Sequence, residues 1–303
     1  MEPILSICIP IYNRSGFLTR MLERFLEDKD LFESKILLKV FDNASPEDLS
    51  GIAASFRQRG LRLQYIRQET NIGPDRNICA CFRAGEGRYT WVLGSDDIPL
   101  PGFLRRVISS LEAGSYGLVH FCHYAEKTSG AMLYTDPERF FMDMHVWITF
   151  ISANIVATRF IAGASLEAYA QTSLSQVPLY LEAGFRSPEN LVLYGSWQEA
   201  ATDALSNGGY NFFEVLTENL LTLVHRPVET GVMSGKSYAR IKRRIFRDFL
   251  AENIINFLIL RRSSGFDTRS GWKTTLRHYG KKPYFYGDLA AKIVSLTLHK
   301  AGL

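Results

Sequence analysis

The chain of 303 residues has no apolar run long enough to span a membrane, which takes about 18 uninterrupted apolar residues. Glu2 and Pro3 precede a short apolar run that does not resemble a secretory signal, so we expect a soluble or peripheral protein of the cytoplasm. Of four cysteines, Cys79 and Cys81 form the one close pair, and the missing second pair argues against a zinc site. Repeats and low-complexity segments are also missing, which leaves an ordinary globular composition with buried free thiols.

Acidic residues are scarce at the C-terminal end: residues 236–303 carry 15 Lys and Arg but four Asp and Glu. Residues 1–235 carry 20 basic and 27 acidic side chains, and this acidic body argues against a nucleic-acid partner because it would repel phosphates. The stretch Arg240–Arg247 predicts a basic amphipathic helix on an anionic membrane surface, such as the inner face of the cell membrane. The alternative is a packed helix with a solvated basic face. The apolar residues in and directly after this basic stretch are Ile241, Ile245, Phe246 and Phe249.

Apolar runs alternate with stretches of helical spacing over the first 125 residues. The runs predict strands at 5–10, 36–41, 61–66, 89–93 and 117–124. The spacing predicts helices at 17–26, 46–58 and 101–112, and a loop that leads into a helix at 71–84. Near-continuous apolar strands joined by helices indicate an α/β fold with a mostly parallel sheet that is flanked by helices.

Beyond residue 125 the pattern is less regular. Short strands are expected at 147–150 and 154–157, and helices at 166–183, 197–205, 212–224, 236–262 and 288–299. The chain therefore continues into a helical C-terminal extension.

Polar residues follow three of the predicted strands at the point where each strand ends. They are Tyr12-Asn13-Arg14, Asp42-Asn43 and Asp96-Asp97. In parallel sheets of this kind, ligands bind beyond the carboxyl ends of the strands. The sequence therefore predicts a binding site at this edge of the sheet.

The adjacent carboxylates of Asp96 and Asp97 raise each other's pKa unless a cation neutralises them. Their oxygens suit Mg²⁺ or Mn²⁺, and Mg²⁺ is usually held by one or two carboxylates together with the phosphates of a substrate. The pair is therefore a candidate clamp for a nucleotide diphosphate. The alternative is that Asp97 caps the turn at residues 98–100.

Three further positions fit a nucleotide. The ring of Tyr12 can stack on a base, although a core tyrosine would also fit there. Asp42 can accept the N–H of a uracil-like base, although Asp and Asn also favour turns. Arg76 lies at a predicted helix start, where phosphate is favoured.

Four motifs, at residues 6–14, 41–45, 71–77 and 93–97, occur in the order and spacing of one family. Over residues 4–125 the chain resembles family-2 glycosyltransferases with the GT-A fold, most of all the bacterial abequosyltransferase-type enzymes of surface polysaccharide synthesis. The resemblance implies a Rossmann-like nucleotide-diphospho-sugar transferase fold. It implies transfer from a UDP-, CDP- or dTDP-sugar to a saccharide acceptor, lipid-linked in O-antigen or capsule synthesis.

The resemblance also assigns roles to single residues. Tyr12 stacks on the base, Asp42 hydrogen-bonds it and Asp96 contacts the ribose. Asp97 is the catalytic ligand of Mn²⁺ or Mg²⁺. The other nucleotide-binding positions are Pro10, Arg14, Asn71, Arg76 and Ser95, and the acceptor side includes Asn154 and Gln176.

The implied domains are a catalytic domain over residues 1–230 and a basic helical region over 231–303. Within the catalytic domain, residues 1–125 form the donor-binding half and residues 126–230 the acceptor-side half.

The general base has no clear position in the sequence. An inverting transferase needs one, and many family members supply it from an acidic Glu-Asp pair where this chain has Ser175 and Gln176. Asp143, Glu199 and Asp203 are the candidates, and a retaining enzyme would need no such base. Two other functions compete with glycosyl transfer: a sugar nucleotidyltransferase and a catalytically inactive nucleotide-binding relative. Nucleotidyltransferases usually have a glycine-rich basic loop after the first strand, and residues 11–16 match such a loop poorly.

Overall fold

A computed structural model describes residues 3–124, 129–199 and 209–300 of the chain. The chain divides into two structural units, which are described separately. Unit 1 comprises Met1–Pro137, Ile148–Gln171 and Ser175–Ala201, and unit 2 comprises Glu138–Trp147, Thr172–Leu174 and Thr202–Leu303.

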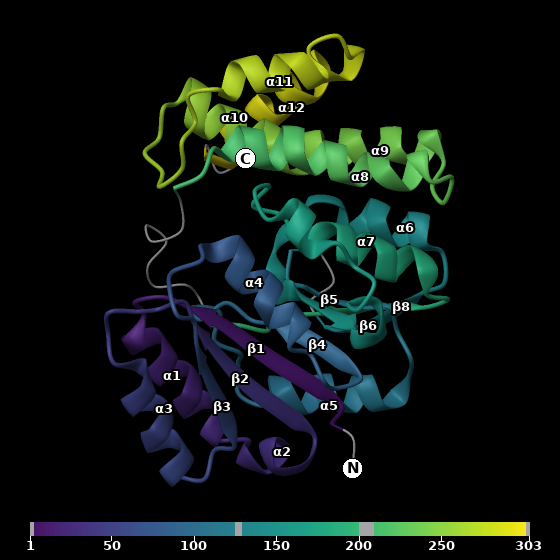
Figure 1. The fold of residues 1–303 in the computed structure, drawn as a ribbon. Coiled ribbons are helices and arrows are strands. Elements are labelled where there is room, and N and C mark those ends of the chain that lie inside the picture. Colours follow the sequence, from purple (N-terminus) through teal and green to yellow (C-terminus); the bar gives the residue numbers. More distant parts are fainter. Residues whose placement is uncertain (1–2, 125–128, 200–208, 301–303) are drawn as a thin grey trace. The chain divides into compact units, whose positions relative to one another are not determined.

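Unit 1 is built on an eight-stranded sheet with the order β3-β2-β1-β4-β7-β5-β8-β6 (Figure 1). The strands are β1 (Leu5–Ile11), β2 (Ile36–Asp42), β3 (Leu63–Arg67), β4 (Tyr89–Val92), β5 (Leu118–Cys122), β6 (Gly130–Tyr134), β7 (Asn154–Ala157) and β8 (Asn190–Tyr194). Strands β1 to β4 pair in parallel, as do β5 and β8, whereas β7 and β6 run antiparallel to their neighbours. The mostly parallel sheet predicted from the sequence is confirmed.

Helices flank this sheet because each has one apolar face. In α1, Leu18, Met21, Leu22 and Phe25 recur at helical spacing and are fully buried. The helices of unit 1 are α1 (Ser15–Leu26), α2 (Lys29–Ser34), α3 (Leu49–Gln58), α4 (Pro74–Arg83), α5 (Phe103–Ala113) and α7 (Val177–Arg186). Helix α4 packs on β1, β2 and β4, and α7 packs on β5 and β7.

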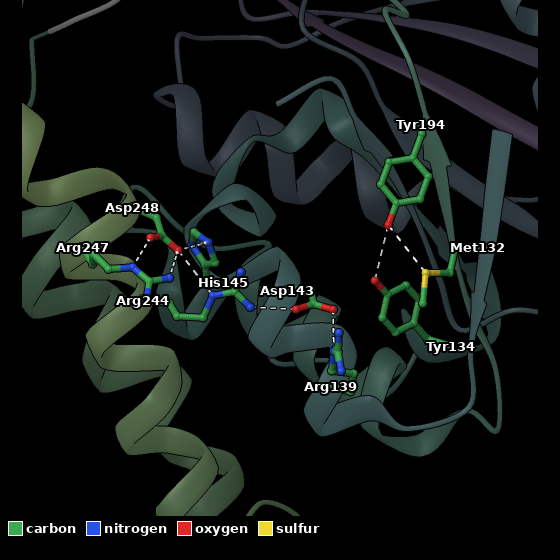
Figure 2. A network of polar contacts seen from close by, with 9 residues as sticks. All are labelled: Met132, Tyr134, Arg139, Asp143, His145, Tyr194, Arg244, Arg247 and Asp248. Carbon is green, nitrogen blue, oxygen red and sulfur yellow. Dashed lines mark hydrogen bonds and ion pairs between the residues drawn. The ribbon is translucent and has the colours of Figure 1, made fainter. Parts of the chain in front are cut away.

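Several expectations for the second half of unit 1 were wrong. The strand expected at 147–150 is the end of a 3₁₀ helix (His145–Thr149), and the helix expected at 166–183 is a 3₁₀ turn (Leu166–Tyr169) followed by α7. Strands β6 and β8 were not expected, because β6 is mostly exposed and β8 is too short a run to identify by periodicity. Tyr194 of β8 holds β6 through Tyr134, with the two hydroxyl oxygens 3.4 Å apart (Figure 2).

Unit 2 is helical. Its elements are α6 (Pro137–Met144, which begins at the last residue of unit 1), a π-helical turn (Glu214–Asn219), α8 (Leu220–Glu229), α9 (Gly235–Ile245), α10 (Ala251–Ile254) between two π-helical turns (Phe246–Leu250 and Ile255–Ile259), α11 (Gly271–Tyr279) and α12 (Pro283–Lys300). The helical run from Gly235 to Ile259 matches the long helix predicted from the sequence. None of the helices in the described ranges is long and apolar enough to cross a membrane.

The apolar residues of the basic stretch Arg240–Arg247 lie inside unit 2. Ile241, Ile245 and Phe246 are buried, and the ring of Phe246 lies 5.0 Å from that of Tyr279 and 5.1 Å from that of Phe285. The apolar residues of this stretch are therefore packed inside unit 2, with Phe246 of the following π-helical turn against α11 and α12.

Candidate functional site

The predicted strand-end residues meet at one edge of the sheet in unit 1. Ile11 pairs with Asp42 at the carboxyl ends of β1 and β2, and the backbone N–H of Leu93 donates to the carbonyl oxygen of Cys8. The loops that follow β1, β2 and β4 therefore lie side by side.

Asp97 is a largely buried carboxyl that is held by Ser152. The Ser152 hydroxyl donates to Asp97 Oδ2 over 2.6 Å and accepts the backbone N–H of Gly94 over 2.8 Å. Burial raises the pKa of Asp97 to about 7, with a further rise from neighbouring Asp96. The hydrogen bond from Ser152 and the charge of Arg14 oppose this rise without cancelling it.

Gly94 lets the chain pass close to these side chains. A Cβ atom at this position would lie 2.7 Å from Asp97 Oδ2, 3.1 Å from Ser152 Oγ and 3.3 Å from Asp96 Oδ1. Any larger residue would therefore push Asp97 away from Ser152.

Asp96 has the cation that Asp97 lacks. Arg14 Nη1 lies 2.9 Å from Asp96 Oδ2, and this ion pair joins the loop after β1 to the loop after β4. Asp97 takes part in none of the ion pairs found in the part of the chain that the structure describes. Nor do the described residues include a cluster of three or more His, Cys, Asp or Glu side chains that could hold a metal. A cation here would need ligands from a substrate.

Asp42 is buried and its two oxygens are fully engaged. Asp42 Oδ1 accepts from the N–H and the hydroxyl of Ser45 at 2.9 and 2.5 Å. Asp42 Oδ2 accepts from Tyr65 Oη and Arg67 Nη1, both at 2.6 Å. Burial disfavours the charged form, but the Ser45 and Tyr65 hydrogen bonds and the Arg67 charge outweigh it and lower the pKa of Asp42.

Tyr12 lies beside this network with an accessible ring. Its side chain is 41% exposed, so it is not the core tyrosine that the alternative interpretation required. The next residue, Asn13, has a left-handed backbone (φ 51°) and donates its N–H to Ser45 Oγ over 3.0 Å. Pro10, by contrast, is part of β1 and pairs with Phe41.

The loop before α4 is tied to the loop after β2. Asn71 Oδ1 accepts from Asn43 Nδ2 and from the N–H of Gly73, both over 2.9 Å. Arg76 is exposed in the first turn of α4, close to helix N–H groups. Ser95 is buried in the turn before Asp96.

Comparison with known proteins identifies this part of the chain. Residues 6–151 match the model of glycosyl transferase family 2. Over this stretch, just under half of the chain, the sequence is similar to family-2 glycosyltransferases. Ser152, which holds Asp97, directly follows the matched residues.

Two relatives are similar to part of this chain. The abequosyltransferase RfbV of Salmonella typhimurium is 34% identical over 95 residues, which is 31% of this chain and 28% of that protein. An uncharacterized protein of Mycobacterium tuberculosis, MT1568, is 33% identical over 117 residues, which is 39% of this chain and 35% of that protein. The chain thus matches about a third of the length of these relatives.

Solved structures show that the fold is of the GT-A type. TarS 1–349 of S. aureus in complex with UDP gives a TM-score of 0.63 at 15% identity, over 86% of this chain and 75% of that one. The mannosyltransferase PcManGT of Pyrobaculum calidifontis in complex with GDP-Man and Mn²⁺ gives a TM-score of 0.55 at 12% identity, over 97% and 87%.

The two residues expected on the acceptor side lie inside unit 1. Asn154 is fully buried, accepts from His120 Nδ1 through its Oδ1 over 2.8 Å and donates through its Nδ2 to the carbonyl of Phe150 over 2.7 Å. The Gln176 amide donates to the carbonyl oxygen of Thr149 over 2.8 Å. Both side chains thus serve contacts within the protein itself.

Glu199, a candidate base, lies next to the Asp96–Asp97 loop through its backbone. Its N–H donates to the carbonyl of Ile98 over 2.8 Å. Its carboxylate pairs with Arg24 and Arg20 at 2.8 and 2.9 Å, and the hydrogen bond from Arg24 is the main cause of its lowered pKa. Asp203, the next candidate along the chain, lies outside the described residues.

Asp143, the third candidate, belongs to unit 2, where Figure 2 shows it between two arginines. Arg139 Nε and Arg244 Nη1 each lie 2.7 Å from a carboxylate oxygen of Asp143. Burial disfavours its charge, but these two partners outweigh that effect and lower its pKa. Asp143 therefore belongs to an ion-pair network of unit 2, whereas the strand-end residues belong to unit 1.

Four contributors to the strand-end site had no assigned role in the sequence. They are Ser45, Tyr65, Arg67 and Ser152. Tyr65 and Arg67 end the strand next to β2, so strand order could have suggested them. Ser152 lies 55 residues from Asp97, and no spacing rule links the two.

Proposed function

We propose that the chain transfers a sugar from a nucleotide diphosphate donor, such as a UDP-, CDP- or dTDP-sugar, to a saccharide acceptor. The observation that carries this proposal is the state of Asp97, a largely buried carboxyl with a pKa raised to about 7 beside Asp96. Burying a carboxylate without a counter-charge is costly, and strongly perturbed groups of this kind cluster at functional sites. A divalent cation that arrives with a diphosphate would supply the missing charge.

The residues at the strand ends fit Mn²⁺ or Mg²⁺. Asp97 offers hard oxygen ligands, and the hydrogen bond from Ser152 orients its carboxylate as partners of metal ligands usually do. One or two carboxylates plus substrate phosphates is a common way to hold Mg²⁺, so a site without a third protein ligand is still suitable. When bound, the cation stabilises the negative charge on the leaving diphosphate.

The protein's own groups hold the donor in this proposal. The exposed ring of Tyr12 stacks on the base, and Arg76 at the start of α4 lies where a phosphate is favoured. Asp42 reaches the base when Arg67, whose side chain is 48% exposed, releases one of its oxygens. Asp96 and Arg14 then face the ribose and the diphosphate.

The acceptor side is proposed from the resemblance, with a lipid-linked saccharide of surface polysaccharide synthesis as acceptor. Glu199 and Asp143 are poor bases at rest, because each is paired with two arginines that lower its pKa. We therefore favour Asp203 as the base, or a retaining reaction that needs none.

A nucleotide panel tests the donor site. The thermal unfolding midpoint is measured with UDP, CDP, dTDP and GDP, with and without Mn²⁺, for the wild type and Asp97→Asn. We expect one diphosphate to raise the midpoint only with Mn²⁺, and the variant to lose this increase. An equal, Mn²⁺-independent increase in both proteins would refute the metal assignment.

The reaction itself is tested with the matching nucleotide sugar. Release of the nucleoside diphosphate by the wild type, and its loss in Asp97→Asn, supports transfer. Binding of the diphosphate without any turnover would identify an inactive relative, and pyrophosphate release from a nucleoside triphosphate and a sugar phosphate would identify a nucleotidyltransferase.

A further inference from the structure

Helix α12 of unit 2 is apolar on two sides, although one side suffices to pack it. Phe285 is buried and its ring lies 5.1 Å from that of Phe246. On another side of the helix, Tyr286 is 62%, Val294 57% and Leu298 45% exposed. The spacing of these three places them on one face, which unit 2 does not cover.

Other elements of unit 2 also expose apolar side chains. Trp272 and Leu276, four residues apart on α11, are 42% and 45% exposed. Eight of the eleven large exposed hydrophobic residues in the described ranges lie between residues 259 and 298. We call these eight the exposed apolar surface: Ile259, Leu260, Trp272, Leu276, Tyr286, Ile293, Val294 and Leu298.

The same segment is strongly basic. Between residues 259 and 298 the chain has eight Lys and Arg side chains and two acidic ones. Both acids are neutralised, Asp267 by Arg269 at 2.8 Å and Asp288 by Arg243 at 2.9 Å. Five exposed cations of the segment take part in no ion pair among the described residues: Arg261, Arg262, Lys273, Lys281 and Lys282.

We propose that the exposed apolar surface binds an anionic lipid bilayer, with α11 and α12 lying on the membrane. Bare apolar side chains among unpaired cations are what a helix at the lipid–water boundary requires. Trp272 and Tyr286 are of the two residue types that concentrate at that boundary. A second copy fits less well, because self-association through this face would bring like charges together.

This surface differs from the one that the sequence suggests. The cations of Arg240–Arg247 were expected to share an amphipathic face with Ile241, Ile245 and Phe246, but those three residues are buried. Membrane contact is thereby assigned to α11 and α12. The inference goes beyond the proposed function, since lipid binding requires neither donor nor acceptor.

Vesicle flotation of the full chain without nucleotide tests the inference. We expect binding to vesicles of phosphatidylcholine and phosphatidylglycerol, and little binding to pure phosphatidylcholine. The variant Tyr286→Ser/Val294→Ser/Leu298→Ser should lower the bound fraction at least about tenfold. The matched control is Leu133→Ser/Val232→Ser, which removes two hydrophobic residues that are 48% and 51% exposed elsewhere, and it should bind like the wild type.

A charge variant separates the two contributions. Lys281→Glu/Lys282→Glu should weaken binding to the anionic vesicles about tenfold and leave the thermal unfolding midpoint unchanged, because both side chains are exposed. Equal flotation of the wild type and the triple serine variant would overturn the inference. So would a dimer in solution that the triple variant abolishes while neither protein floats.

The outcome is separable from that of the proposed function. Donor binding, measured by thermal shift, should be the same in the wild type and the triple serine variant. If the wild type floats but binds no nucleotide, the proposed function fails and the membrane surface stands.

Discussion

Asp97 in unit 1 and the pair Asp143 and Asp248 in unit 2 are partly buried carboxylates with opposite electrostatic environments. In unit 2, Asp143 and Asp248 lie among Arg139, Arg244 and Arg247, and the pKa of each is lowered (Figure 2). In unit 1, Asp97 has a serine as its partner and a pKa of about 7. Acids that stabilise a fold come with their cations, whereas an acid left without one is suited to a cation from outside.

The largest expected difference between the two sites is in turnover when each acid is replaced by its isosteric amide. Asp97→Asn should lower the turnover of the donor about a thousandfold or more, because the leaving diphosphate loses its cation. The measurement is release of nucleoside diphosphate at saturating Mn²⁺. Asp143→Asn is the matched control, and a comparable loss of turnover per folded molecule in that variant would contradict the comparison.

Stability should respond in the reverse order. Asp143→Asn removes the carboxylate that Arg139 and Arg244 share and should lower the free energy of unfolding by about 2–3 kcal/mol. Asp97→Asn should lower it by less or raise it. Urea denaturation at pH 8 without metal measures both, and equal destabilisation by the two variants would count against distinct roles.

The stability contributed by Asp97 and by the two acids of unit 2 should change with pH in opposite directions. The folded pKa of Asp97, about 7, lies above its ordinary value of 3.8, so the folded state holds a proton that the unfolded state has lost. Its contribution to stability therefore falls as pH rises from about 4 to about 7, by up to about 4 kcal/mol. Asp143 and Asp248 have lowered pKa values, so their charged forms stabilise the folded state. This stability is lost as pH falls below 3.8, the ordinary pKa of an aspartate.

Urea titrations of wild type and Asp97→Asn at pH 5 and pH 8, without metal, check the sign. The wild type should lose stability relative to the variant between the two pH values. Mn²⁺ should bind more tightly at pH 8 than at pH 6, because it competes with the proton on Asp97. Metal binding that does not change with pH would contradict this assignment.

The smallest effect is expected for Ser152, whose hydroxyl positions the carboxylate of Asp97. Ser152→Ala removes the hydrogen bond that favours the charged form of Asp97, so the pH midpoint of Mn²⁺ binding should move upward, by about one pH unit or less. Ser55→Ala, which removes a hydroxyl bonded to the carbonyl of Ile52, is the control. A loss of stability in Ser152→Ala without a shift of the midpoint would indicate a structural role.

Most of the first half of the fold could be predicted from the sequence, but little of the second half could. Strands β1, β2, β4 and β5 are buried apolar runs, and helices separate the first five strands, so these strands are visible in the sequence. Strand β7 was expected, but its antiparallel place between β4 and β5 depends on contacts across the sheet. Strand β6 is mostly exposed and gives no apolar signal.

The candidate site follows the same division. Asp42 and Asp97 stand at strand ends, and parallel strands bring such ends together. What the sequence could not give is the partner of each acid, because Arg67 and Ser152 are chosen by tertiary packing. The burial of Asn154 and Gln176 could not be predicted from the sequence either, because polar residues such as Asn and Gln are mostly exposed in proteins.

The packing around Asp97 also gives the protein an optical probe of its own. The Trp91 indole N–H donates to the carbonyl oxygen of Ser152 over 2.8 Å, and the ring of Trp197 lies 6.3 Å from that of Trp91. Both rings are buried, whereas Trp272 is exposed. Ser152 thus links Trp91 to the carboxyl that we assign to the metal, and we expect tryptophan emission to change when the cation binds.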